Sequence, residues 1–334
     1  MSISRFDVRL MTVLIVLQCL TACARKPQGP LAYVSNERDG TISVIDTNAD
    51  RVVETIKAGA RARGIRLSPD GRRVYVALST PSGKDYNEAD NHIAAIDRAS
   101  GKVVATYNVG TDPEQLAVSR DGRRLYASNE DAGTASVTDT ETGQLIATLV
   151  TGIEPEGVTI SPDGRWVYVT AETSNTVSVI DTEKNQVTAS FLVGSRPRDV
   201  AFSPDSTRAY VTSEIGRTLS VLDTSTHKVI RTVELPRGDY VKPMGVCVSL
   251  DGRKVYVAMG RADEVSVLDT ESFNVLATIP VGQRVWGLAI TPDGRKVYTA
   301  NGLSNDVSVI DTATDTVVAT IKAGDGPWGI AIRP

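Results

Sequence analysis

Histidine and cysteine are scarce in this sequence, with two and three residues among 334. Side-chain ligands for haem or for a transition metal are therefore few, and no Cys-x-x-Cys-His motif that attaches haem covalently is present. Blocks of like charge are also lacking, since 36 Lys and Arg stand against 40 Asp and Glu for a net charge of −4. Without a basic stretch to neutralise phosphates, nucleic acid is not an expected partner.

The N-terminus carries an apolar run from Leu10 to Leu20, preceded by Arg5 and Arg9. The run is short for a membrane span but suits the central region of a secretory signal peptide. It ends in Leu20-Thr21-Ala22-Cys23, which resembles a bacterial lipobox, the site at which a signal peptide is removed and the cysteine acylated.

We therefore expect a signal peptide over residues 1–22, lipidation at Cys23 and a short polar tether over residues 23–30. The expected location is the periplasm, anchored to either the inner or the outer membrane. The alternative is an ordinary cleaved signal peptide with an incidental cysteine. After cleavage only Cys247 remains, so no internal disulfide can form. Its strand-like apolar surroundings indicate a buried small side chain rather than a nucleophile.

A repeat organises the rest of the chain. Tyrosine recurs with spacings of 42, 51, 42, 42, 46 and 42 residues, and an aspartate follows each tyrosine by 13 residues or, once, by 22. The tyrosines are Tyr33, Tyr75, Tyr126, Tyr168, Tyr210, Tyr256 and Tyr298. The aspartates are Asp46, Asp97, Asp139, Asp181, Asp223, Asp269 and Asp311. Because they recur once per repeat, blade packing for the tyrosines and turn hydrogen bonds for the aspartates are favoured over seven metal or acid sites.

Each repeat contains four short runs of β-branched and alternating residues between Gly, Pro, Asp and Asn, whereas no stretch has a helical period. Four-stranded units of about 42 residues are typical of a β-propeller, in which radial closure protects the sheet edges. The prediction is an all-β, seven-bladed β-propeller of four-stranded antiparallel blades over residues 31–334. The chain starts with a second strand and ends with a first strand, so the C-terminal strand should join three N-terminal strands in one blade.

At these residues the chain resembles the YVTN β-propeller repeat family, over about residues 31–332. It is most similar to the seven-repeat propellers associated with pyrroloquinoline-quinone (PQQ)-dependent alcohol catabolism and with transport operons. The stretches that carry this likeness are Asp112-Pro113-Glu114-Gln115, Asn129-Glu130-Asp131-Ala132-Gly133, Arg196-Pro197-Arg198-Asp199-Val200 and Asn301-Gly302-Leu303-Ser304-Asn305-Asp306. The resemblance implies a periplasmic accessory role and no particular reaction.

Two insertions mark one face of the predicted disc. They lie between the second and third strands of one repeat, at residues 80–91, and before the first strand of another, at residues 236–240. Both connections belong to the same face, here called the upper face. Length variation confined to one face of a repeat array often marks the binding face.

The upper face should carry a ring of side chains around the central opening, contributed by the residue before each innermost strand: Arg63, Glu114, Glu156, Arg198, Met244, Trp286 and Trp328. Four of the seven second strands end beside a further glutamate: Glu37, Glu130, Glu172 and Glu214. These positions predict a funnel with one acidic and one aromatic sector, suited to a cationic or amphiphilic ligand or to a protein loop.

The candidate ligand- or partner-binding residues are Arg63, Glu114, Glu130, Glu156, Glu172, Arg198, Glu214, Trp286 and Trp328. The alternatives are a solvated rim for the carboxylates and blade-to-blade packing for the tryptophans. His92 and His227 fall on opposite faces, which disfavours a shared metal site. Neither histidine has a compelling nucleophile and orienting acid, so no Ser-His-acid triad is assembled. We predict no catalytic residue, no metal site and no cofactor.

Two functions remain open from the sequence. The first is a non-catalytic lipoprotein that binds a partner or ligand in quinoprotein-dependent alcohol oxidation and associated transport. Its expected partners are periplasmic proteins of that system, with the membrane engaged through the lipid anchor. The second is an enzyme, either a lactonase-like metal hydrolase using the rim carboxylates or a quinone-binding dehydrogenase subunit. Charge reversal at Glu114 and Glu156 is expected to weaken partner capture without altering the fold.

Overall fold

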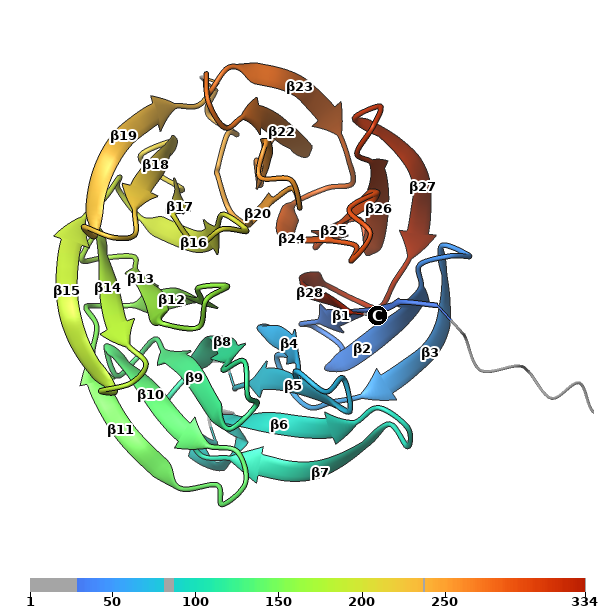
Figure 1. Cartoon of the computed structure of the whole chain (residues 1–334). Coiled ribbons are helices and arrows are strands. Elements are labelled where there is room, and N and C mark those ends of the chain that lie inside the picture. Colours follow the sequence, from blue (N-terminus) through green and yellow to red (C-terminus); the bar gives the residue numbers. More distant parts are fainter. Residues whose placement is uncertain (1–28, 81–86, 237, 334) are drawn as a thin grey trace, which may run out of the picture.

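Seven four-stranded antiparallel sheets surround a central axis in the computed structural model, which describes residues 29–80, 87–236 and 238–333 (Figure 1). The predicted seven-bladed propeller is confirmed. The expected signal peptide, Cys23 and most of the expected tether lie outside the described residues. Among the residues that are described, no helix is long and apolar enough to cross a membrane.

The innermost strand of each blade lines the axis and the outermost strand forms the rim (Figure 1). The innermost strands are β4 (Ile65–Leu67), β8 (Pro113–Val118), β12 (Pro155–Ile160), β16 (Pro197–Phe202), β20 (Val246–Val248), β24 (Val285–Ile290) and β28 (Pro327–Arg333). The outermost strands are β3 (Arg51–Lys57), β7 (Lys102–Tyr107), β11 (Leu145–Val150), β15 (Gln186–Leu192), β19 (Lys228–Glu234), β23 (Val275–Pro280) and β27 (Thr316–Lys322).

Two middle strands per blade carry the repeated tyrosine and aspartate. The tyrosine strands are β1 (Leu31–Asn36), β5 (Arg73–Leu78), β9 (Arg124–Asn129), β13 (Trp166–Ala171), β17 (Arg208–Ser213), β21 (Lys254–Ala258) and β25 (Lys296–Asn301). The aspartate strands are β2 (Thr41–Asp46), β6 (His92–Asp97), β10 (Thr134–Asp139), β14 (Thr176–Asp181), β18 (Thr218–Asp223), β22 (Glu264–Asp269) and β26 (Asp306–Asp311). One short 3-10 helix, η1 (Glu88–Asp90), precedes β6.

Closure of the ring depends on the pairing of β28 with β1. The two strands run antiparallel, with Tyr33 opposite Ala331 and Val34 opposite Ile330. The sheet order β28-β1-β2-β3 confirms that the C-terminal strand completes the N-terminal blade.

The repeated tyrosines hold neighbouring blades together. Their side chains are at most 2% exposed, and each belongs to an apolar cluster between two blades. Tyr126, for example, packs with Val158 and Val167 of the next blade. Burying a side chain of this size stabilises the fold by about 1.5–3 kcal/mol, so the core is a series of blade interfaces around the ring.

The repeated aspartates are turn residues, as expected. Asp181 accepts hydrogen bonds from the backbone N–H groups of Glu183 and Lys184, both at 3.0 Å. In the Ser-Pro-Asp-Gly turn, Asp163 accepts from Arg165 N at 3.0 Å, and Gly164 has a φ of +80° that favours glycine. These carboxylates satisfy backbone donors, so they shape the turns rather than form seven metal sites.

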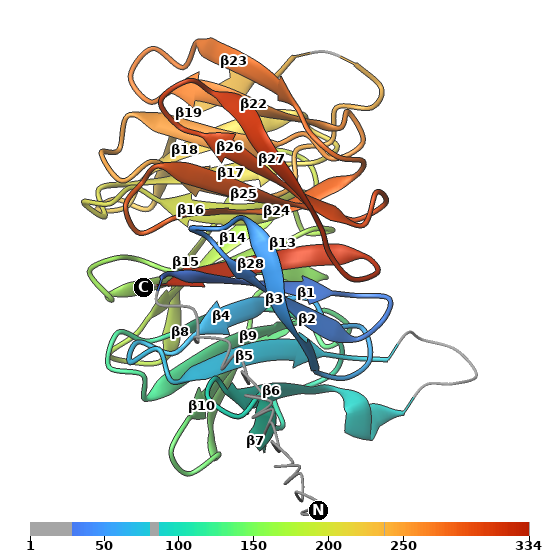
Figure 2. The same cartoon turned by 90° about the vertical axis from the view of Figure 1, so that its right-hand side faces the viewer.

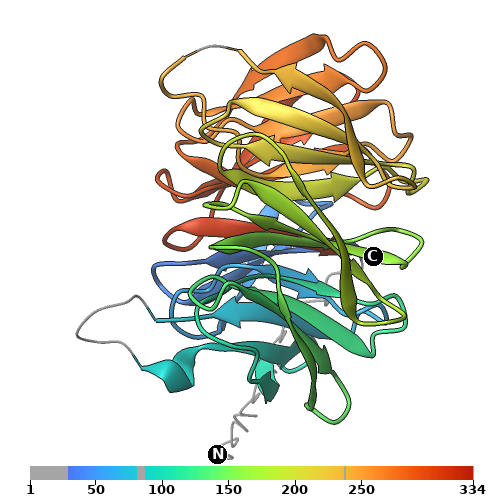
Figure 3. The ribbon, with the colours of Figure 1, turned by 90° about the vertical axis from the view of Figure 1, so that its left-hand side faces the viewer.

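Figures 2 and 3 show that the connection containing η1 and the connection between β19 and β20 lie on the same side of the disc. Both predicted insertions therefore belong to the upper face. The end of β28 lies on the opposite, lower side (Figure 2). A side chain at the start of an innermost strand is thus near the upper face, and one at its end is near the lower face.

Deleting residues 327–334 should open the ring. The deletion removes the strand that pairs with β1 and its large buried side chains Trp328 and Ile330, each 5% exposed. The expected loss of about 5 kcal/mol or more would abolish a single cooperative urea transition monitored by circular dichroism. A chain that begins at Gly29 is the control and should unfold as the intact chain does. An unchanged midpoint after the C-terminal deletion would contradict closure as the main stabilising contact.

Candidate functional site: a buried charged ring above a central cavity

The predicted ring of side chains converges at the upper end of the central axis. Arg63 and Met244 lie two residues before the start of β4 and β20, whereas the other five members are the second residue of their strands. The inner strands begin earlier than the sequence suggested because a bulge follows the first residue, for example between Pro155 and Val158. This irregularity turns the ring side chains toward the axis while the rest of the strand stays paired.

Ion pairs join the ring members of the fourth and fifth blades. Arg198 contacts Glu172 and lies 2.8 Å from Glu156 and 3.9 Å from Glu214. Arg196, above it, lies 2.7 Å from Glu172 and 3.1 Å from Glu214. Two arginines and three glutamates therefore form one network in which every member has an opposite charge beside it.

A second network joins the first three blades. Arg63 contacts Glu114 and lies 2.8 Å from Glu37. Arg61 lies 2.5 Å from Asp112 and 3.5 Å from Glu114. Arg61, Asp112 and Arg196 were not among the predicted site residues. Each lies two residues before a ring member, and this spacing could have indicated that they belong to the site. The arginine pairs at positions 61/63 and 196/198 belong to the second and fifth blades. The third and fourth blades, which lie between them, have carboxylates at the two equivalent positions.

The tryptophans belong to the same ring. Trp286 and Trp328, from neighbouring inner strands, are stacked with centroids 6.2 Å apart and planes at 28°. The guanidinium of Arg63 lies 5.6 Å from the Trp328 ring centre, and those of Arg198 and Arg284 lie 5.7 Å and 4.4 Å from that of Trp286. Arginines thus connect the aromatic side to the acidic side through cation–π contacts, so the two sectors are one assembly.

The solvated-rim interpretation is wrong for the inner carboxylates. Glu114, Glu156 and Glu172 are 0%, 3% and 2% exposed. Since charge reversal at Glu114 or Glu156 would leave arginines buried beside like charges, the expectation that it spares the fold is also wrong. We give the name charged ring to six residues around the axis: Arg63, Glu114, Glu156, Glu172, Arg198 and Trp328.

Burial and neighbouring charges act in opposite directions on these carboxyl groups. Burial favours a higher pKa for Glu114, but the charges of Arg63 and Arg61 outweigh it and lower the pKa. Burial raises the pKa of Glu156 to about 7 against the effect of Arg198, and the charge of Glu114 adds to the rise. Burial and the charge of Glu114 raise the pKa of Glu130 to about 9. Glu130 therefore carries a proton at neutral pH.

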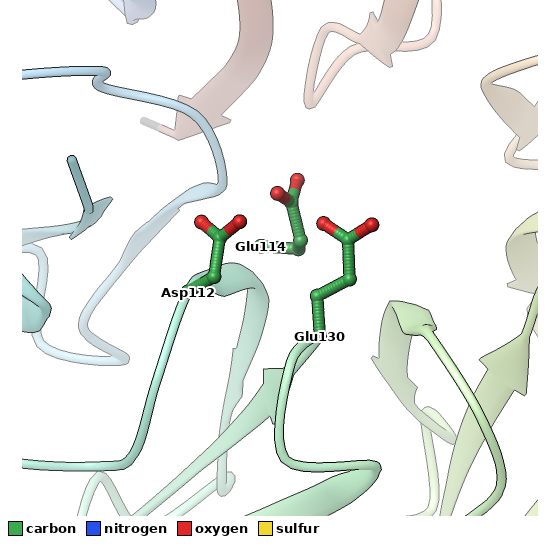
Figure 4. Close-up of side chains that lie close together, drawn as sticks. All are labelled: Asp112, Glu114 and Glu130. Carbon is green, nitrogen blue, oxygen red and sulfur yellow. The ribbon is translucent and has the colours of Figure 1, made fainter. Parts of the chain in front are cut away.

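Three carboxyl groups converge beside the ring: Asp112, Glu114 and Glu130 have oxygen atoms within 4.8 Å of one another (Figure 4). Oxygen donors of this kind suit a hard divalent cation. Arg61 and Arg63 already neutralise Asp112 and Glu114, however, and Glu130 is protonated. A cation would have to displace a proton and compete with two guanidinium groups.

A cavity of about 460 Å³ lies along the axis next to the charged ring. Its upper wall includes Glu156, Arg198 and the two tryptophans, and its lower wall includes Phe202 and Ile332. This volume is within the range of small-molecule sites, roughly 300–1,000 Å³. The cavity is therefore large enough to hold a small molecule.

Neither histidine lies in this cavity. His227 Nδ1 is 2.8 Å from the hydroxyl oxygen of Tyr168, its ring packs against Trp166, and burial lowers its pKa. His92 is the first residue of β6 and follows the connection that contains η1. Cys247 does line the cavity, but burial strongly raises the pKa of its thiol, which is consistent with the expected unreactive side chain.

The fold and the central site can now be compared with known proteins. The chain belongs to the Choice-of-anchor I domain family, whose profile matches residues 23–197. The profile of the seven-bladed β-propeller lactonase family matches residues 182–322. No curated protein matches the chain.

Solved structures share the fold at low identity. The hydrazine synthase of Kuenenia stuttgartiensis is 22% identical, with a TM-score of 0.71, and the match covers 81% of this chain and 89% of that one. A protein of unknown function from Desulfotomaculum acetoxidans is 19% identical, with a TM-score of 0.73 and coverage of 90% and 98%. A proposed 6-phosphogluconolactonase from Bacteroides uniformis is 18% identical, with a TM-score of 0.77 and coverage of 92% and 100%. At these identities the likeness shows a common fold.

Replacing Arg198 by alanine should strongly destabilise the propeller. Glu156 and Glu172 would remain buried without the guanidinium that contacts both, and breaking a buried ion pair on one side costs about 3–5 kcal/mol. Urea unfolding at pH 8 measures the loss. The control Arg72→Ala removes a side chain that is 85% exposed and should change stability by less than about 0.5 kcal/mol. Equal stabilities of the two variants would contradict the network.

Stability should fall as pH rises because of Glu130. Its pKa is about 9 in the folded protein but about 4.3 in an unfolded chain, so the folded state holds the extra proton between these values. The free energy of unfolding then decreases with increasing pH across this window. Melting temperatures from pH 5 to 9 should decline less steeply in Glu130→Gln, while the exposed control Glu141→Gln should follow the wild type. Parallel curves for wild type and Glu130→Gln would exclude the proposed protonation.

Proposed function

We propose that this protein is an exported, lipid-anchored propeller that acts as a binding accessory in PQQ-dependent alcohol catabolism and associated transport, without catalysing a reaction itself. The setting rests on the sequence likeness to propellers of such systems and on the lipobox-like Leu20-Thr21-Ala22-Cys23. We infer a periplasmic location and periplasmic protein partners on the same grounds.

The observation that carries the binding role is the combination of a charged ring, in which each glutamate is paired with an arginine, with the cavity beside it. Glu114, Glu156 and Glu172 are engaged by arginines and buried, so they serve as structural anchors rather than as a general acid and base. The cavity of about 460 Å³ is instead shaped to hold a molecule. The site thus supports recognition more than chemistry.

The upper face also offers contacts to a protein partner. Three apolar side chains at its connections are strongly exposed: Ile153 at 61%, Ile215 at 54% and Leu303 at 61%. Arg196, which rises from the ion-pair network, has a side chain that is 44% exposed. Exposed apolar groups next to a charged group that can pair across an interface are typical of docking surfaces.

A double substitution, Ile153→Asp and Ile215→Asp, should therefore release the partner and leave the fold intact, because both side chains are exposed. The experiment is affinity purification of the tagged protein from cells grown on an alcohol, followed by mass spectrometry and metal analysis. Wild type should recover a dehydrogenase, cytochrome or transport component, and the double variant should lose at least about nine-tenths of it. The matched control, Leu250→Asp, alters a side chain that is 50% exposed in a turn of the lower face.

Recovery of the same components by wild type and the double variant would contradict docking through the upper face. Recovery of no component of such a system by the wild type would contradict the proposed setting.

A metal-dependent hydrolase is the second candidate, favoured by the converging oxygens of Asp112, Glu114 and Glu130 and by the match to the lactonase family. These three residues lie outside residues 182–322, where that match falls. A stoichiometric divalent ion in the purified protein, lost in Glu130→Gln, together with lactone hydrolysis abolished by a chelator, would replace the binding role with this function.

A further inference from the structure

The inner strands depart from their own repeat at a few cavity-facing positions. The residue opposite the repeated tyrosine is alanine in four blades: Ala117, Ala201, Ala289 and Ala331. In the other three blades it is Arg66, Thr159 or Cys247, and all three line the cavity. A small residue suffices for the fold at this position, so an arginine there calls for another explanation.

A second position shows the same kind of exception. Two residues before the position opposite the tyrosine, five blades have glycine: Gly64, Gly157, Gly245, Gly287 and Gly329. A Cβ on Gly64 would lie 2.5 Å from Glu114 O, so glycine lets adjacent inner strands approach. The remaining two blades have Gln115 and Asp199, and both side chains also line the cavity. Arg66, Gln115, Asp199, Thr159 and Cys247 thus form a polar belt inside the cavity.

Arg66 is the charged member of this belt with hydrogen-bonding capacity to spare. A guanidinium has five N–H donors, and the described structure shows one bond from it, from Nη1 to Ile65 O at 2.8 Å. Within the residues that the structure describes, no carboxylate oxygen lies at ion-pair distance from Arg66. Burial lowers its pKa, and the charge of Asp199 opposes this effect. A guanidinium in this situation would gain from a bound anion.

Asp199 does not supply that anion directly. Its Oδ1 accepts a hydrogen bond from Val200 N at 2.9 Å, and its Oδ2 accepts one from Val246 N at 3.1 Å. Oδ1 therefore bonds within β16, and Oδ2 joins β16 to β20. Burial raises the pKa of Asp199, and the charge of Arg66 and the two backbone hydrogen bonds oppose this rise. Gln115 Oε1, also buried, has no hydrogen-bond partner in the described structure.

The remaining walls are largely apolar. Leu67, Phe202, Val248, Leu288, Ile330 and Ile332 line the cavity together with Trp286 and Trp328. At the upper end the charge of Arg198 is already balanced by glutamates. The charged group with unused hydrogen-bond donors that a ligand would meet is Arg66, surrounded by surfaces that favour hydrocarbon.

We propose that the central cavity binds an organic monocarboxylate with an apolar body, and that Arg66 holds its carboxylate group. This inference deepens the proposed function and rests on it for the source of the ligand, since four-electron oxidation of a primary alcohol, by way of the aldehyde, yields a carboxylate. The ligand is an anion with an apolar body rather than the cationic molecule expected from the upper-face glutamates. Gln115 offers an amide N–H₂ group that can donate to the same carboxylate.

The test compares three probes of nearly the same shape: benzoate, benzyl alcohol and benzylammonium. Isothermal titration calorimetry is carried out at pH 7.5 with the intact purified protein. In the blank titration each probe is added to the same buffer and lipid without protein. Benzoate should bind at least about tenfold more tightly than either other probe, because only it can accept charge-assisted hydrogen bonds from Arg66.

Three variants distinguish the contribution of the ligand's carboxylate group to binding from the contribution of its apolar body. Arg66→Met should weaken benzoate at least about tenfold and leave benzyl alcohol unchanged. Arg66→Lys retains a cation and should keep part of the preference for benzoate over benzyl alcohol. Thr159→Leu narrows the cavity without changing its charge and should weaken benzoate and benzyl alcohol alike. The control Arg72→Met, on an exposed turn, should bind all probes as wild type does, and melting curves verify that each variant is folded.

Equal binding of benzoate and benzyl alcohol, or an unchanged benzoate affinity in folded Arg66→Met, would overturn the anion site. If both probes still weaken in Thr159→Leu, the cavity binds ligands and the proposed binding role survives. If no probe binds while the wild type still recovers its partner proteins, the carboxylate site is overturned and only the docking role remains.

Discussion

The pairing of β28 with β1 is the contact on which the rest of the structure depends. It joins the two ends of a chain whose blades are otherwise linked only to their neighbours. It also brings Trp328 into contact range of Arg63, although 265 positions separate them in the chain. Without this closure, the charged ring would lack one of its aromatic members and the cavity one of its walls. The pairing of these two terminal strands thus determines whether the central site is complete.

Close approach of the inner strands is the second constraint. Gly64 N donates to Glu114 O and Gly245 N donates to Trp286 O, both at 2.9 Å, so the backbones of adjacent blades are in direct contact near the axis. This approach crowds the ring side chains and excludes water from them. Carboxylates that would be solvated on a wider ring are here buried, and arginines from other blades must neutralise them.

The charged ring also separates two surfaces with different properties. Above it lie exposed groups such as Ile153 and Arg196, which suit a protein partner. Beside it lies the central cavity with the polar belt around Arg66, which suits a small molecule. Because the buried ion pairs are costly to break, the ring is a rigid boundary, and binding on one surface need not disturb the other.

The sequence by itself determined the seven blades, their closure and the turn role of the repeated aspartates, because these follow from residues that recur at a fixed period. It also placed Glu114, Glu156 and Arg198 at the end of the axis. Only the tertiary structure decided that Glu114 pairs with Arg63 and Glu156 with Arg198, since both ion pairs join different blades. The cavity and the role of Arg66 likewise depend on strands from separate repeats meeting at the axis, and no local pattern specifies how much space remains between them.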